Sequence, residues 1–184
     1  MQQNNLEHLL RLAVSEGKNR IHYSIFTINK RLIAKRNDSW EKANNEYKLG
    51  RFLFEEGVSV PEMHELVPPD SVLGERHSYE LEEWFIIMER IHGKDLLKFD
   101  RKSSEFIEAA EQYKAELEKV LDLGIVPDDS SAGYNAMFNQ RKRKTYLIDF
   151  EFWRKGTKKE LDKVRRYLKY ISKDWSNLYY DSWG

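Results

Sequence analysis

The sequence predicts a fold of the α+β class, and three patterns lead to this prediction. Apolar residues recur at three- and four-residue spacing over residues 104–123, which is typical of an amphipathic helix. Residues 84–88 form a continuous apolar run, as in a strand that is covered on both faces. Apolar residues on either side of Asn29 and Lys30 indicate two strands joined by a tight turn. With 184 residues, the chain is long enough for one core of ordinary size or for two small lobes that share one.

The first sixty residues are expected to form a helix, two strands and a second helix. The first helix covers about residues 5–14, the strands lie within residues 22–35, and the second helix covers residues 40–57 with Gly57 at its end. Residues 58–61 are expected to be extended, because the residue before a proline avoids the helical region. The side chains expected to face the core from the two helices are Leu6, Leu9, Leu10, Ala13, Ala43, Tyr47, Phe52 and Leu53.

The second half of the chain is expected to begin with a hinge over residues 89–93, before the long helix. Two short strands follow that helix, at about residues 135–138 and 145–150, and flank a basic turn. Thr157 and Glu160 form a capping box, which predicts the start of a last helix. The apolar stripe of that helix comprises Leu161, Val164, Leu168, Ile171 and Trp175.

The composition excludes several classes of protein. Lysine and arginine balance aspartate and glutamate at 31 each, so no global field attracts the chain to nucleic acid or to an anionic membrane. The chain has no cysteine, which excludes a disulfide scaffold and thiolate zinc sites. No run of about eighteen apolar residues occurs, so we expect no membrane-spanning helix. The N-terminus lacks the apolar run of a signal peptide, and we expect a cytoplasmic protein.

The residues with the clearest chemical meaning lie in the last third of the chain. An acidic loop carries Asp128 and Asp129, Asn135 opens one short strand, and Asp149 closes the next. Phosphoryl transfer needs metal ions that neutralise the phosphate oxygens and a carboxylate near the acceptor hydroxyl, so Asp and Asn side chains must converge from adjacent segments. Asp149 also interrupts an apolar run, where an unpaired carboxylate is costly unless it binds something. The alternative for the acidic loop is a turn in which Asp128 and Asp129 only cap backbone amides.

The order of these segments resembles that of the protein-kinase-like superfamily. A strand with an interior lysine, a helix with a glutamate, a hinge, a long helix, an acidic loop and a strand ending in aspartate follow one another over about residues 15–175. The run from Leu147 to Glu151 is especially similar to the small archaeal, bacterial and viral members. The resemblance implies a two-lobed protein-kinase-like fold with a reduced C-terminal lobe. The whole chain, residues 1–184, is then one kinase-like domain with an N-lobe over about 15–90, a hinge over about 89–95 and a C-lobe over about 96–184.

The resemblance assigns nucleotide-binding roles in the first lobe. Lys35 matches the strand lysine that holds the nucleotide phosphates, and Glu46 on the following helix matches its ion-pair partner. Met88, Glu89 and Ile91 match the hinge whose backbone binds adenine.

The resemblance assigns the metal and the proton transfer to the second lobe. Asn135 and Asp149 match the two Mg²⁺ ligands, and Asp129, or else Asp128, takes the place of the catalytic carboxylate. The chain departs from the family pattern in three ways. It has no His-Arg-Asp triplet, one extra residue separates Asp129 from Asn135, and the Gly-rich phosphate loop is reduced to Gly17.

Three functions therefore compete. The first is an ATP- and Mg²⁺-dependent kinase that acts on a hydroxyl, with protein serine or threonine as the first expected acceptor and a small-molecule hydroxyl as another. The second is a kinase-fold module that binds a nucleotide or a partner without transferring phosphate, as the irregular catalytic loop favours. The third is nucleic-acid binding or cleavage, indicated by the basic turn at residues 141–144 and the aromatic residues after Trp175, and the neutral net charge argues against it.

Overall fold

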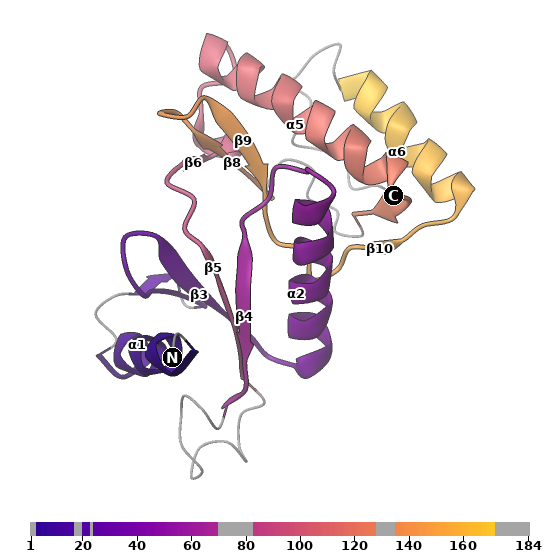
Figure 1. The fold of residues 1–184 in the computed structure, drawn as a ribbon. Coiled ribbons are helices and arrows are strands. Elements are labelled where there is room, and N and C mark those ends of the chain that lie inside the picture. Colours follow the sequence, from indigo (N-terminus) through magenta and orange to yellow (C-terminus); the bar gives the residue numbers. More distant parts are fainter. Residues whose placement is uncertain (1–2, 17–19, 23, 70–82, 128–134, 172–184) are drawn as a thin grey trace. The chain divides into compact units, whose positions relative to one another are not determined.

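The computed structural model describes residues 3–16, 20–22, 24–69, 83–127 and 135–171. The chain divides into two compact units (Figure 1). Unit 1 comprises Met1–Arg51 and Glu62–Arg90, and unit 2 comprises Phe52–Pro61 and Ile91–Gly184. Because the second helix ends in unit 2, the chain passes between the units three times before it enters the long helix.

Unit 1 is built on a five-stranded sheet in the order β1-β2-β3-β5-β4, and its neighbouring strands pair in antiparallel fashion. The strands are β1 (Arg20–His22), β2 (Ile25–Thr27), β3 (Leu32–Asn37), β4 (Met63–Val67) and β5 (Trp84–Glu89). The interior strand β5 pairs with β3 on one side and with the edge strand β4 on the other, which explains why its apolar run is buried.

Helix α1 (Gln3–Glu16) covers one face of this sheet and carries Leu10 and Ala13 into its core. Side chains alternate along a strand, and the register therefore places every second residue on this face. The strand residues in this core are Phe26, Ala34, Val67, Phe85 and Ile87. The neighbours of Ala34 and Phe85 in sequence, including Lys35 and Ile86, belong to the opposite face.

Helix α2 (Trp40–Glu55) packs on that opposite face through small residues. Ala43 is fully buried, and Gly50 lies so close to the sheet that an added Cβ would be 2.4 Å from the Met63 Cε atom. Ala43, Glu46 and Gly50 lie on one side of the helix, because residues three and four apart are neighbours on a helix surface. The small side chains at both ends of this row bring Glu46 close to the sheet.

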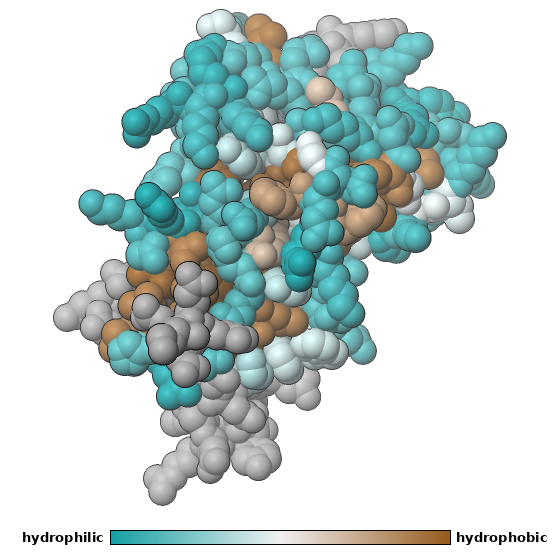
Figure 2. Space-filling model, viewed as in Figure 1, coloured by the Kyte–Doolittle hydropathy of each residue, from teal (hydrophilic) through white to brown (hydrophobic). Residues whose placement is uncertain are grey.

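Unit 2 is organised around helix α5 (Ser104–Asp122), against which helix α6 (Lys158–Ile171) packs (Figure 1). A three-stranded antiparallel sheet in the order β6-β8-β9 lies beside α5, and β7 pairs with β10. The remaining elements are β6 (Lys94–Asp95), η1 (Leu96–Lys98), β7 (Ile125–Val126), β8 (Ala136–Asn139), β9 (Lys144–Leu147) and β10 (Arg154–Lys155). In the view of Figure 2, hydrophilic side chains cover most of the surface over α5 and α6.

Most of the expected elements are confirmed, and the α+β class with them. The long helix ends one residue earlier than expected, and α2 ends at Glu55, before Gly57 with its φ of 76°. The capping box also forms, because Glu160 Oε2 accepts a hydrogen bond from the Thr157 N–H at 2.7 Å. Arg154 and Thr157 together lower the pKa of Glu160 to about 2.

One expectation was wrong, and one strand was not anticipated. Phe52 does not face the core but is 39% exposed, because the small residues of α2 define a contact face on which Phe52 does not lie. Strand β4 was not anticipated, because His64 and Glu65 interrupt its apolar pattern and its pairing partner β5 lies far along the chain. Trp175 lies outside the described residues. In the part of the chain that the structure describes, no helix combines the length and the apolar character needed to cross a bilayer.

Candidate active site

Lys35 and Glu46 form the best-defined charged pair of unit 1. Lys35 Nζ donates hydrogen bonds to Glu46 Oε1 at 3.0 Å and to Glu46 Oε2 at 2.8 Å. The Glu46 side chain is 1% exposed and that of Lys35 is 14% exposed. Asn37, which is also buried, donates from Nδ2 to Glu46 Oε2 at 3.5 Å. A buried carboxylate is tolerated only with such partners, and the pair therefore fixes the position of the lysine ammonium group.

The alternation of β3 selects Lys35 for this role and excludes its neighbour. Lys35 pairs in register with Ile25 and Ile86 and faces α2, whereas Arg36 faces away. Arg36 Nη1 instead pairs with Glu83 Oε1 at 2.9 Å. The two adjacent basic residues of β3 therefore have different partners on opposite faces of the sheet.

The three residues expected to form the hinge lie at the end of β5 and just beyond it. Met88 is buried within β5, where it lies opposite Ile33 on one side and Met63 on the other. Glu89 and Ile91 are half-buried. The Glu89 N–H donates to the Glu62 carbonyl oxygen at 2.9 Å. Their role in binding adenine stays a prediction.

In unit 2 the β8–β9 hairpin brings Asn135 and Asp149 to the same end. Ala136 and Leu147 are opposite each other in register, and the Ile148 N–H donates to the Asn135 carbonyl oxygen at 2.9 Å. Asp149 follows directly, and its φ is 66°, in the left-handed region. This conformation costs roughly 1–2 kcal/mol for a residue other than glycine, although aspartate tolerates it better than most. The strained aspartate and the asparagine together offer the oxygen ligands that Mg²⁺ prefers.

Burial does not explain Asp149, contrary to one of the arguments from sequence. Leu147 and Phe150 are fully buried, but Asp149 is not, because the chain leaves the strand after Leu147. The apolar run therefore reflects the neighbours of Asp149 and not its own surroundings. Because Asp149 is exposed, its carboxylate needs no bound cation to offset burial, and its role as a Mg²⁺ ligand stays a prediction.

The hairpin is held in place by side chains of α5. Gln112 accepts a hydrogen bond from the Thr145 N–H at 2.9 Å and donates to the Arg143 carbonyl oxygen at 3.1 Å. Thr145 Oγ1 donates to the Ala109 carbonyl oxygen at 3.0 Å, and Arg143 pairs with Glu108. Two of the basic residues expected in the turn, Arg143 and Lys142, thus have partners within unit 2. These contacts fix strand β9, which ends two residues before Asp149.

Ser59 and Glu116 also support the hairpin, and no pattern in the sequence pointed to this role for either residue. The Ser59 N–H donates to Glu116 Oε2 at 2.8 Å, and the Ser59 carbonyl oxygen accepts from the Leu147 N–H at 2.8 Å. Burial raises the pKa of Glu116, but the hydrogen bonds from Ser59 and Lys119 outweigh it, and the pKa lies below the ordinary 4.5. Ser59 and Glu116 are 57 residues apart, so no local pattern could have paired them.

Asp128, Asp129 and Gly17 lie outside the described residues. The catalytic role of Asp129 or Asp128, and the phosphate contact of Gly17, stay predictions. Strand β7 belongs to the described residues. It is buried and ends two residues before Asp128.

No protein-family model matches this chain, and no curated protein matches it. Among solved structures, the chain is similar to a high-resolution crystal structure of WbdD and to a medium-resolution structure described as the bifunctional kinase-methyltransferase WbdD. The TM-score is 0.54 for both, the sequence identity is 16% and 17%, and the likeness covers 84% and 83% of this chain. The likeness covers 36% of each of these two chains, so this chain spans about a third of their length. At this identity the likeness is one of fold alone: the fold is similar to part of a kinase-methyltransferase.

Proposed function

We propose that this protein is an ATP- and Mg²⁺-dependent phosphotransferase with a two-lobed kinase-like fold, acting on serine or threonine hydroxyl groups of a protein. Units 1 and 2 correspond to the two lobes in this proposal. The observation that carries it is the Lys35–Glu46 pair, in which a buried glutamate holds a lysine on a central strand. A lysine fixed in this way is the residue that kinase-fold enzymes use for nucleotide phosphates.

The sheet architecture supports the kinase half of the WbdD description over the methyltransferase half. Open α/β sheets that bind nucleotide-like cofactors are mostly parallel and hold the ligand at the carboxyl ends of their strands. In the described part of this chain, the strand pairings are antiparallel. The antiparallel sheet with its Lys35–Glu46 pair therefore fits the kinase description better than the methyltransferase description.

Each unit contributes a different part of the chemistry. In unit 1, Lys35 supplies a positive charge for the phosphate oxygens, and Glu46 keeps its ammonium group in one place. In unit 2, Asn135 and Asp149 supply oxygen ligands for Mg²⁺, which would neutralise charge on the phosphates. The acceptor oxygen forms a bond to the γ-phosphorus while the bond to the β–γ bridging oxygen breaks. The hydroxyl proton passes to Asp129 or Asp128, and ADP leaves.

The test compares the wild type with Asp149→Asn, because asparagine is nearly isosteric and tolerates the left-handed conformation. Thermal unfolding is measured without ligand, with ATP and with Mg²⁺-ATP. A ligand present at a hundred times its dissociation constant stabilises the native state by about 2.7 kcal/mol. We expect the wild type to gain such stability with Mg²⁺-ATP, and the variant to lose the Mg²⁺-dependent part while its unliganded stability stays the same. Turnover should fall on the order of a hundredfold or more.

Asp38→Asn is the matched control, because Asp38 is an exposed aspartate that pairs with Lys42 on the surface of unit 1. It should leave both ligand responses unchanged. An Asp149→Asn variant that is unstable without ligand but still responds fully to Mg²⁺-ATP would show that Asp149 is structural. Stabilisation by Mg²⁺-ATP without any transfer of phosphate to a protein or a small-molecule hydroxyl would instead identify a nucleotide-binding module without transfer activity.

A further inference from the structure

Unit 2 carries a strongly basic surface formed by β10 and α6, which we call the α6 surface. Arg154 and Lys155 of β10 are both exposed, and α6 adds six exposed cations. These six are Lys158, Lys159, Lys163, Arg165, Arg166 and Lys169. Three acidic residues, Asp122, Glu160 and Asp162, lie among the eight cations, which leaves an excess of five positive charges on a chain whose net charge is zero.

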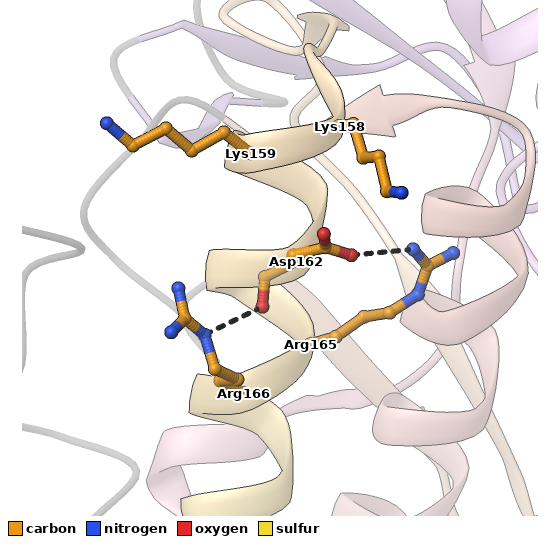
Figure 3. A pocket seen from close by; sticks show the side chains of 5 residues that line it. All are labelled: Lys158, Lys159, Asp162, Arg165 and Arg166. Carbon is orange, nitrogen blue, oxygen red and sulfur yellow. Dashed lines mark hydrogen bonds and ion pairs between the residues drawn. The ribbon is translucent and has the colours of Figure 1, made fainter.

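The helical repeat explains why the cations gather on one side. Val164 and Leu168 are buried, and they define the face of α6 that packs against α5 and β7. At 100° per residue all six cations lie about 80° or more from the centre of this buried face, so they occupy the flanks and the solvent side of the helix. They extend from Lys158 to Lys169, a distance of about 16 Å along the axis. Five residues of this side line an open depression (Figure 3).

The acidic residues neutralise only a part of this charge. Arg154 pairs with Glu160 at 2.7 Å, and Arg165 pairs with Asp122 of α5 at 2.7 Å. Asp162 lies between two pairs of cations, with Lys159 and Arg166 on one side and Lys158 and Arg165 on the other (Figure 3). Its carboxylate is 3.9 Å from the Arg165 guanidinium. These three ion pairs involve arginines, and Lys158 and Lys159 at the start of the helix are exposed.

The basic surface begins beside the strand that leads to the expected catalytic loop. Arg154 lies opposite Val126 in the β7–β10 pair, and Lys155 lies opposite Ile125. The Gly156 N–H also donates to the Gly124 carbonyl oxygen at 2.9 Å, which ties the start of α6 to the start of β7. Asp128 and Asp129 follow Val126 within three residues in the sequence.

From this placement we propose that the α6 surface binds an acidic polypeptide segment, and that the serine or threonine to be phosphorylated belongs to that segment or adjoins it. The inference rests on the proposed function. Carboxylates of such a segment complement the excess positive charge, and electrostatic complementarity raises the association rate and sets specificity. The acceptor would then be selected by the acidity of its surroundings.

Two other anionic partners fit the surface less well. A helix that lies on a membrane presents large apolar side chains together with its cations, but Tyr170 is the large exposed hydrophobic residue that α6 contributes in the described part. A nucleic acid presents a closely spaced row of phosphates, which Asp162 at the centre and Asp122 at the edge would repel. The carboxylates of a peptide can be spaced to avoid both acids.

The test uses three fluorescent peptides of equal length, each with one serine flanked by glutamates, by glutamines or by lysines. Binding is followed by fluorescence anisotropy, and phosphorylation with Mg²⁺-ATP gives kcat and KM for each peptide. The variant Lys158→Glu/Lys159→Glu reverses two charges in the first turn of α6, where acidic residues favour the helix. The matched control Lys98→Glu/Lys102→Glu makes the same charge change at exposed positions elsewhere in unit 2. A milder variant, Lys158→Gln/Lys159→Gln, removes the two positive charges at the same site without replacing them by negative ones.

We expect the wild type to bind and phosphorylate the acidic peptide in preference to the other two, with an affinity that falls as salt is added. The reversal variant should bind the acidic peptide about tenfold or more weakly and raise its KM, with kcat and the thermal response to Mg²⁺-ATP unchanged. The milder variant should lie between it and the wild type, and the control pair should resemble the wild type.

Several outcomes would overturn the docking proposal. These are equal use of the glutamate and glutamine peptides, equal losses in the reversal variant and the control, or tighter binding of a labelled oligonucleotide or of phosphatidylserine vesicles than of the acidic peptide. Phosphorylation without a preference for acidic peptides would leave the proposed function intact. Binding of the acidic peptide without any response to Mg²⁺-ATP would refute the phosphotransferase and retain the acidic-peptide surface.

Discussion

Replacement of Lys35 by methionine separates the structural role of the Lys35–Glu46 pair from its proposed chemical role. Methionine is similar in length to lysine, but it leaves the carboxylate of Glu46, which is 1% exposed, without the ammonium group 2.8 Å away. Removal of one partner from a buried ion pair costs about 3–5 kcal/mol, because the other charge stays buried. Lys35→Met should therefore lose a large fraction of the 5–15 kcal/mol that typically stabilises a folded protein.

A second substitution should restore the stability but not the function. In Lys35→Met/Glu46→Gln the buried charge is gone, and the glutamine oxygen can still accept the hydrogen bond from Asn37. Replacement of a buried ion pair by neutral groups is often close to neutral in stability. The double variant should therefore recover most of the loss, while Mg²⁺-ATP turnover stays low because no cation faces the phosphates.

Arg36→Met is the matched control on the adjacent position of the same strand. The Arg36–Glu83 pair is partly exposed, and such pairs contribute up to about 1 kcal/mol. Urea unfolding gives the free energies, and hydrogen exchange of the β3 and β5 amides reports on unit 1 specifically. Equal losses in Lys35→Met and Arg36→Met, or full turnover in the double variant, would refute the role of Lys35.

Two further predictions concern the supports of unit 2. Because the folded pKa of Glu116 lies below 4.5, its charged form stabilises the fold above that pH, and this stabilisation is lost as the pH falls through the folded pKa. Melting temperatures between about pH 7 and about pH 3 should thus fall more steeply for the wild type than for Glu116→Gln, and parallel curves would contradict this. Gly93→Ala would place a Cβ 2.7 Å from the Phe138 carbonyl oxygen, a backbone atom that cannot rotate away. It should cost about 1–3 kcal/mol in urea unfolding, and a loss below about 0.5 kcal/mol would mean that β8 shifts easily.

The sequence by itself determined the elements whose signals are local. The helical periodicity of α5, the apolar run of β5 and the capping box of α6 each involve residues within about one element's length, and each forms as expected. Strand alternation likewise separated Lys35 from Arg36. The fold class follows from these elements.

The resemblance already paired Lys35 with Glu46, but only the tertiary structure shows how the candidate residues are brought into place. Lys35 reaches Glu46 because Gly50 lets α2 lie close to Met63, a contact that no spacing in the sequence encodes. In unit 2, Asn135 and Asp149 lie at the same end of a hairpin that Gln112 holds on α5. The exposure of Asp149 and the clustering of cations beside β7 also depend on where the chain turns. Local sequence sets the periodicity of each element, but the contacts of a site depend on the packing of side chains that lie far apart along the chain.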